Sequence, residues 1–252
     1  MELLFLGTGA ADRLTLPQDS DFSNPDNRRC SAAILDRKIL FDCGPHILNS
    51  LSVAGIDLKE ITDICVTHFH KDHFDIETVN QIISATNGLL NIWYNADALA
   101  DLLPMGCNLH PMEAFKPYVI GGYEIVGLPA NHEAFPQHLS VTDGDKSLFY
   151  GLDGAWLLGD TVRYMQGREY NAVILDATVG DYSGDYRMGE HNSLPMLRLM
   201  VDSMKTLNII NKNTQIILDH IAVILHKPHN DIVNNVANDG FIVAHDGLKI
   251  EI

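Results

Sequence analysis

Short apolar runs alternate along the chain with segments of helical periodicity, and this alternation is typical of an α/β protein. The length of these runs and their branched apolar side chains favour buried strands. The expected strands cover residues 2–6, 32–35, 38–41, 63–67, 123–128, 147–151, 173–176, 215–218, 241–244 and 249–252. The last two flank Asp246 and Gly247, a residue pair that is typical of a hairpin turn.

Helical periodicity marks residues 47–54, 75–86, 97–103, 194–207 and 230–238. The fourth segment is the clearest, because Ser193 can cap its start and Pro195 fits its first turn. Its apolar residues recur at helical spacing and predict a core-facing stripe: Leu197, Met200, Val201, Met204 and Leu207. No linker, low-complexity segment or short repeat interrupts the pattern, so we expect a single domain over residues 1–252.

The negative net charge of the 252-residue chain limits the classes of molecule that it is expected to bind. The formal net charge is −16 at pH 7, whereas a long nucleic acid normally binds to a basic surface. No long nucleic acid is therefore expected. A small anionic substrate stays open, because bound divalent ions would make a pocket locally positive.

The sequence also bears on the cellular location of the protein, on its cysteines and on its oligomeric state. No run is long enough to cross a bilayer, and the first residues lack the pattern of a secretory signal. We therefore expect a cytoplasmic location and no membrane partner. The four cysteines have no zinc-knuckle spacing and are interpreted as unpaired thiols. The oligomeric state stays open, with a homodimer as one option.

Four metal-competent side chains lie within six positions, and these are His68, His70, Asp72 and His73. They follow an expected buried strand, at the point where the chain turns into a loop. Residues i and i+2 of an extended segment point to the same side, so His68 and His70 can hold one ion together. Asp72 and His73 can then face a second ion. Imidazole and carboxylate ligands suit zinc, manganese or iron.

Three more metal-capable residues come shortly after expected strands, and these are His132, Asp153 and His220. Loops at strand ends often gather into one cleft, so these residues are the candidates that complete the site.

Other residues compete for these positions. Asp160 is an alternative to Asp153, which we prefer because the run that ends at Asp153 makes the better strand. His138 lies at the start of a strand, and His226 and His229 lie in a loop or at a helix start, so all three rank lower.

With these residues in this order, the chain resembles the metallo-β-lactamase superfamily. Residues 5–10 and 40–45 match it as well, so the likeness covers nearly the whole chain. The resemblance implies a four-layer αβ/βα sandwich with a dinuclear site at one edge. It assigns one metal to His68, His70 and His132, and the other to Asp72, His73 and His220. Asp153 would bridge the two ions.

His191 comes just before the expected helix at 194–207, within a segment similar to one in the phosphodiesterase branch of that superfamily. The branch includes transfer-RNA 3′-processing nucleases and cyclic ribose phosphate phosphodiesterases. The resemblance implies that this histidine contacts the phosphate and assists the leaving oxygen. A helix N-terminus favours anions, and its dipole is expected to lower the pKa of the imidazole. Asp72 and His191 are thus the candidate catalytic residues.

Some residues are expected to act indirectly or not at all. Asp42 and Asp176 are interpreted as carboxylates that brace metal ligands through hydrogen bonds instead of binding the metal directly. Solvated surface roles are expected for Arg28, Arg29 and Arg187. The cysteine-rich zinc site of the cyclic phosphate enzymes and the basic arm of the nucleases have no counterpart in this sequence.

Hydrolysis is the expected chemistry, because a hydroxide held between two divalent ions is a nucleophile at neutral pH. Zinc and manganese are the leading candidates for the metal, and iron is a third. Asp153 stands where the resemblance implies cysteine in the commonest β-lactamases, so antibiotic hydrolysis is not expected. We expect a phosphodiesterase that acts on a small cyclic or nucleotide-like phosphate ester. An acyl hydrolase for lactones or thioesters is the alternative, and a non-hydrolytic ligand-binding or cofactor-pathway protein is a third hypothesis.

Overall fold

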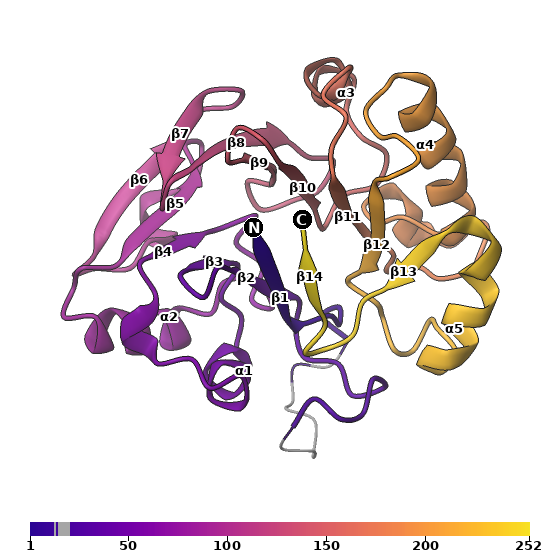
Figure 1. The fold of residues 1–252 in the computed structure, drawn as a ribbon. Coiled ribbons are helices and arrows are strands. Elements are labelled where there is room, and N and C mark those ends of the chain that lie inside the picture. The colour runs from indigo at the N-terminus through magenta and orange to yellow at the C-terminus, as the bar shows by residue number, and fades with distance from the viewer. Residues whose placement is uncertain (13, 15–20) are drawn as a thin grey trace.

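Two seven-stranded sheets face each other in the computed structural model, which describes residues 1–12, 14 and 21–252 (Figure 1). The first sheet has the order β14-β1-β2-β3-β4-β5-β6. Its strands are β1 (Glu2–Gly7), β2 (Ala32–Leu35), β3 (Ile39–Phe41), β4 (Asp63–Cys65), β5 (Asn91–Asn95), β6 (Asn108–Met112) and β14 (Lys249–Glu251). The strands from β3 to β6 run parallel, and the others pair antiparallel.

The second sheet has the order β13-β12-β11-β10-β9-β8-β7. Its strands are β7 (Pro117–Ile120), β8 (Tyr123–Pro129), β9 (Gln137–Thr142), β10 (Ser147–Gly151), β11 (Ala172–Asp176), β12 (Gln215–Asp219) and β13 (Phe241–Val243). The strands from β10 to β13 run parallel, so the carboxyl ends of β10, β11 and β12 meet at one edge.

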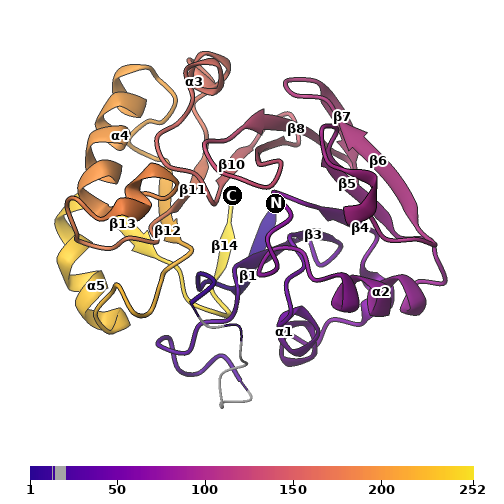
Figure 2. The ribbon, with the colours of Figure 1, turned by 180° about the vertical axis from the view of Figure 1, so that it is seen from behind.

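Helices cover the outer faces of both sheets (Figures 1 and 2). They are α1 (Ile47–Val53) and α2 (Ile76–Ala85) on the first sheet, and α3 (Gly159–Met165), α4 (Leu194–Thr206) and α5 (His229–Val236) on the side of the second. Short 3-10 helices occur at Leu58–Glu60, Ala100–Leu102, Tyr186–Gly189 and Ala237–Asp239. None of the described helices is long and apolar enough to cross a bilayer.

Both faces of the central strands of each sheet are buried, which explains their nearly continuous apolar runs. Along β1, Leu3 and Phe5 face the core between the sheets, while Leu6 packs in the cluster that α1 and α2 cover. Phe41 of the first sheet and Tyr150 of the second meet in the central core, with ring centroids 5.0 Å apart. The expected four-layer α/β sandwich is confirmed.

Two local predictions are wrong, and the alternative ligand Asp160 does not lie at a strand end. The strands β13 and β14 do not form a hairpin, because β13 pairs with β12 and β14 pairs with β1 of the other sheet. Residues 97–103 form only the 3-10 turn Ala100–Leu102 instead of an α-helix. Residues 157–160 are not a strand end, because Asp160 lies in the first turn of α3.

Candidate metal centre

The first ligand loop follows β4 at the edge where the two sheets meet. Its entry is fixed by Asp42, whose carboxylate accepts hydrogen bonds from the Thr67 backbone N–H at 2.7 Å and the Thr67 hydroxyl at 2.8 Å. The loop then turns tightly, because the N–H of His73 donates to the His70 carbonyl at 3.0 Å. At its end Asp75 caps α2 by accepting from the Thr78 N–H.

The structure brings all seven predicted ligands together. His68, His70, His132 and Asp153 form one set, and Asp72, His73, Asp153 and His220 form the other. Within each set the candidate ligand atoms lie within 4.8 Å of one another. Asp153 belongs to both sets, which is the position that the resemblance assigns to the bridging ligand.

Each set draws on both sheets. The loop after β4 carries His68 to His73, whereas His132 follows β8, Asp153 follows β10 and His220 follows β12. Only the packing of the two sheets therefore creates the site.

Within the two ligand sets, one nitrogen of each of several imidazole rings faces a nitrogen of a neighbouring histidine. His73 Nε2 lies 3.1 Å from His220 Nε2, and His70 Nδ1 lies 3.1 Å from His68 Nε2 and 3.2 Å from His132 Nε2. His220 Nε2 lies 2.9 Å from Asp153 Oδ1, yet this buried oxygen has no hydrogen-bond donor among the described residues. Nitrogen lone pairs and carboxylate oxygens that converge in this way fit divalent cations of the zinc, manganese or iron type.

Neighbouring side chains orient the imidazoles from behind. His73 Nδ1 donates to Asp42 at 2.7 Å, and His220 Nδ1 lies 2.7 Å from the Thr178 hydroxyl. These bonds leave the Nε2 atoms of both rings free to face the second ligand set. The bracing role expected for Asp42 therefore has a direct geometric counterpart.

The electrostatics of the site depend on the balance between burial and nearby charges. Burial, together with the neighbouring His73, lowers the pKa of His68 to about 3. For His220, burial opposes protonation, but the Asp153 carboxylate outweighs it and raises the pKa to about 10. Burial also opposes ionisation of Asp153, yet the surrounding imidazoles hold its pKa well below the usual range. Asp153 is therefore an ionised carboxylate among histidines.

Three residues of the site have a left-handed backbone: Asp42 with φ 67°, Asp153 with φ 47° and His220 with φ 57°. Each stands one or two residues after the end of a strand, where the chain must turn sharply to aim its side chain. Side-chain-bearing residues adopt this conformation at a cost, and such residues concentrate at functional sites.

His191 lies beside the two ligand sets, in the segment between β11 and α4. Its Nδ1 donates to the Asp176 carboxylate at 2.7 Å, and its ring stacks on that of His220 at a centroid distance of 5.5 Å. Burial opposes protonation of His191, but Asp176 outweighs it and raises the pKa. The expected lowering by the helix dipole is therefore wrong, because a carboxylate at hydrogen-bond distance is the stronger influence. Asp176 therefore braces His191, which is not one of the predicted ligands, whereas it was expected to brace a metal ligand.

A cavity of about 230 Å³ opens onto the ligands. Its lining includes His70, Asp72, His132, Asp153, His191 and His220, together with Arg187, Thr178 and Glu190. Sequence reasoning missed Thr178 and Glu190. Thr178 lies two positions beyond Asp176 at the end of β11, and only that place at a strand end could have pointed to it.

The competing residues lie elsewhere. Asp160 is exposed and pairs with Arg163 on α3. His138 lies within β9, buried, with no hydrogen-bond partner for either ring nitrogen among the described residues. His226 bonds to the Ala177 carbonyl at 2.7 Å, and His229 begins α5.

The expectation of solvated arginines is wrong for two of the three. Arg28 and Arg29 are 3% and 1% exposed, and their guanidinium groups lie inside the protein. Arg29 pairs with Asp246 at 3.1 Å, and Arg28 donates to the Ala244 carbonyl at 2.7 Å. The two arginines thus anchor the segment that links β13 to β14, whereas Arg187 is half-buried at the cavity.

Known proteins share the sequence motif and the fold. A family model described as "Anti-Pycsar protein Apyc1" matches residues 1–79. The chain is 37% identical over 76 residues to ribonuclease Z of Clostridium tetani, a match that covers 29% of this chain and 21% of that enzyme. Among solved structures, a diphosphatase of the PhnP family has a TM-score of 0.77 at 20% identity, covering 100% of this chain and 96% of the other. The metallo-β-lactamase fold protein YhfI of Bacillus subtilis has a TM-score of 0.74 at 15% identity, covering 100% and 98%.

The chain has the fold of the metallo-β-lactamase fold protein YhfI, and it resembles ribonuclease Z in sequence over 76 residues. The resemblance inferred from the motif is thereby confirmed. The match spans about a fifth of the length of the ribonuclease, so the activity of that enzyme is not transferred with it.

Proposed function

We propose that the chain is a dinuclear metal-dependent phosphodiesterase that acts on a small cyclic or nucleotide-like phosphate ester. The names of two similar proteins, a ribonuclease and a diphosphatase, describe cleavage at phosphorus. Sequence likeness to the first and structural likeness to the second support phosphate chemistry over acyl transfer.

The observation that carries this proposal is the pair of ligand sets that share Asp153, with His191 lining the same cavity. Two divalent ions held there would supply Lewis acidity that activates water and polarises a phosphoryl oxygen. The ligands fit zinc or manganese best, and iron is a third candidate.

The protein's own residues would orient the reactants and move protons. The Asp72 carboxylate, 3.3 Å from His73 Nε2, lines the cavity and would hold the attacking water in place. His191 Nδ1 is engaged by Asp176, which leaves the Nε2 atom to donate a proton to the leaving oxygen. The Asp176 carboxylate raises the pKa of His191, which favours the protonated form of this ring.

The size and charge of the cavity favour a small substrate. Among the residues that the structure describes, Arg187 is the one arginine in its lining, and the net charge of the chain is −16. The name of the ribonuclease relative points to RNA for that protein, so an RNA substrate is the main alternative to test.

Turnover of bis(p-nitrophenyl) phosphate by protein loaded with manganese or zinc tests this function. We expect activity that falls by about 100-fold or more in His191→Gln, because a positioned acid contributes about 10²–10⁴ in rate. Metal content should stay unchanged, since His191 belongs to neither predicted ligand set.

His110→Gln is the matched control, because this histidine stacks on Trp93 away from the site, with ring centroids 4.2 Å apart. Turnover of acyl esters without turnover of any phosphodiester would reject the proposal, and so would full activity in His191→Gln.

A further inference from the structure

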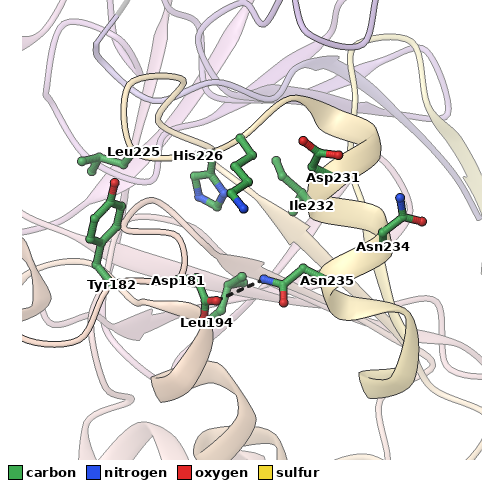
Figure 3. Close-up of a pocket in the computed structure, with 10 residues that line it drawn as sticks. Asp181, Tyr182, Leu194, Leu225, His226, Asp231, Ile232, Asn234 and Asn235 are labelled. Atoms are coloured by element: carbon green, nitrogen blue, oxygen red, sulfur yellow. Dashed lines mark hydrogen bonds between the residues drawn. The ribbon is translucent and has the colours of Figure 1, made fainter.

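A second cavity of about 650 Å³ adjoins the metal cavity, and Figure 3 shows its lining. Tyr182 and Leu225 stand at one end of it, and the α5 residues Asp231, Asn234 and Asn235 stand at the other. The metal cavity, at about 230 Å³, is smaller than the roughly 300–1,000 Å³ typical of small-molecule sites. A nucleotide-sized ester would therefore extend beyond it.

The two cavities share one wall. Leu225 lines both, and the segment that carries it packs against residues 177–180, which run from the metal cavity into the second one. His226 Nε2 donates to the Ala177 carbonyl at 2.7 Å. Gly180 has φ 70°, and a Cβ there would lie 2.6 Å from the Leu225 carbonyl oxygen, so the wall is closely packed. Leu225 is thus the boundary that a ligand at the metals would cross to reach the second cavity.

The lining of the second cavity suits a flat, neutral group with N–H donors. Tyr182 is 52% exposed and offers an aromatic face for stacking. Asp181 and Asp231 place carboxylates in the lining, Lys227 places an ammonium group there, and Arg198 pairs with Asp181 at 3.6 Å. These opposite charges largely balance, so the lining does not call for a charged ligand. Asn235 donates to Asp181 at 3.4 Å, and Asn234 beside it supplies another amide.

We propose that this second cavity is a nucleobase subsite for the substrate whose phosphodiester lies at the metal centre. The proposal rests on the phosphodiesterase function and narrows it to substrates that carry a base. Tyr182 stacks on the base, and the polar groups of Asp181 and Asn235 bind its edge. The base can belong to a mononucleotide or to the end of an RNA strand.

Binding of free nucleosides tests the subsite without any turnover. Isothermal titration of cytidine and guanosine into metal-loaded protein should show binding that weakens roughly tenfold in Tyr182→Ala, because base stacking contributes strongly in such sites. Asn235→Ala should weaken it about fivefold. Val233→Ala is the matched control, since Val233 is an exposed residue of α5 outside the lining. Absence of nucleoside binding, or equal binding by Tyr182→Ala, overturns the subsite whatever the activity of the protein.

Steady-state kinetics with three substrates then test the nucleobase subsite independently of the phosphodiesterase activity. They also show whether the base belongs to a mononucleotide or to an RNA end. Tyr182→Ala should raise KM for cyclic nucleotides or for a short single-stranded RNA while kcat changes little. KM for bis(p-nitrophenyl) phosphate, which has no base, should change less than about twofold. A rise in KM confined to RNA assigns the base to an RNA end, and a rise confined to cyclic nucleotides assigns it to a mononucleotide. An equal rise for all three substrates overturns the subsite and leaves the phosphodiesterase in place.

Discussion

Asp42 belongs to neither predicted ligand set, yet its hydrogen bonds fix the conformation of the ligand loop. Its carboxylate accepts from the Thr67 backbone N–H and from His73 Nδ1, both at 2.7 Å. One side chain therefore fixes the path of the loop and the orientation of one imidazole. Bracing groups of this kind govern metal affinity almost as strongly as the ligands do.

We expect Asp42→Asn to weaken binding at the second ligand set by about 10- to 100-fold, because a neutral amide is a poor acceptor for His73 Nδ1. Equilibrium titration of the metal against a coloured chelator measures this. Asp63→Asn is the matched control, since Asp63 is also a buried carboxylate but bonds to Trp93 Nε1 at 2.8 Å instead of to a site histidine. Unchanged affinity in Asp42→Asn would contradict the bracing role.

His46 supplies a pH dependence that is separate from the metals. Its Nδ1 accepts from the Cys30 N–H at 3.0 Å, and its Nε2 lies 2.9 Å from the Leu14 carbonyl, so the neutral ring is fully bonded. Burial lowers its pKa below the ordinary value. The unfolded chain therefore takes up this proton first as the pH falls, and stability present above about pH 6.5 is lost below it.

Between pH 7 and pH 5, we expect the free energy of unfolding of metal-free wild-type protein to change less favourably than that of His46→Leu, because only the wild type loses the contribution of the neutral His46 ring. The variant should also lose about 1–3 kcal/mol at pH 7, because the buried Cys30 N–H loses its acceptor. Urea titrations at the two pH values measure both effects. Equal slopes in the two proteins would exclude His46 as a source of the pH dependence.

At the scale of elements, the site is a set of loops that must approach one another closely. Gly44, in the segment between β3 and α1, has no side chain at the point where the ligand loop passes. A Cβ at this position would lie 1.9 Å from the carbonyl oxygen of Asp72. Backbone atoms cannot yield as a flexible side chain can, so an added methyl group must displace the ligand loop.

We expect Gly44→Ala to destabilise the protein by about 1–3 kcal/mol, as overpacking does, and to weaken metal binding. Thermal or urea unfolding and a metal titration measure the two effects. Gly159→Ala at the start of α3 is the control, because its Cβ would meet only Arg163 Nη1 at 3.5 Å and alanine favours helix. A Gly44→Ala protein with wild-type stability would show that the loop can move freely.

The elements that the sequence predicts well are those whose apolar pattern is unambiguous. β12 and α4 occur almost as expected, because one is a continuous apolar run and the other has a capped helical stripe. β5, β6 and β7 were not predicted, since Asn, His and Pro interrupt their apolar patterns. The predicted hairpin of β13 and β14 is wrong, because a turn motif indicates the local backbone geometry and does not indicate the sheet to which each strand belongs.

For the candidate site, too, the sequence predicts the features that depend on local pattern and misses those that depend on tertiary packing. Ligands at strand ends, such as His132 and His220, follow from local pattern and motif, and the structure brings them together. Thr178 and the second cavity depend on how loops from separate strands pack, which no local pattern encodes. The pKa of His191 was misjudged for the same reason, because its bond to Asp176 is a tertiary contact.

At the scale of the whole molecule, the ligands come from both sheets, so bound ions would connect the two halves of the sandwich. The loop after β4 belongs to the first sheet, and Asp153 and His220 belong to the second. An unfolded chain does not hold these residues close together, so metal binding favours the folded state.

We expect zinc or manganese at about 1,000 times its dissociation constant to raise the free energy of unfolding by about 4 kcal/mol per site relative to chelated protein. Calorimetric or urea unfolding with and without metal measures this difference. Asp153→Asn should lose most of the gain at both sites, because Asp153 belongs to both ligand sets. An identical unfolding midpoint in chelated and metal-loaded wild-type protein would argue against a dinuclear centre.

The left-handed turns at Asp42, Asp153 and His220 have an evolutionary consequence. Glycine adopts that conformation without steric penalty, so glycine at any of these positions would relieve local strain while deleting a carboxylate or an imidazole. A directed-evolution campaign that selected only for heat resistance, in medium stripped of divalent ions, should therefore accumulate glycine at these turns. The resulting proteins would be more stable to heat, but they would bind metal weakly and would have little catalytic activity.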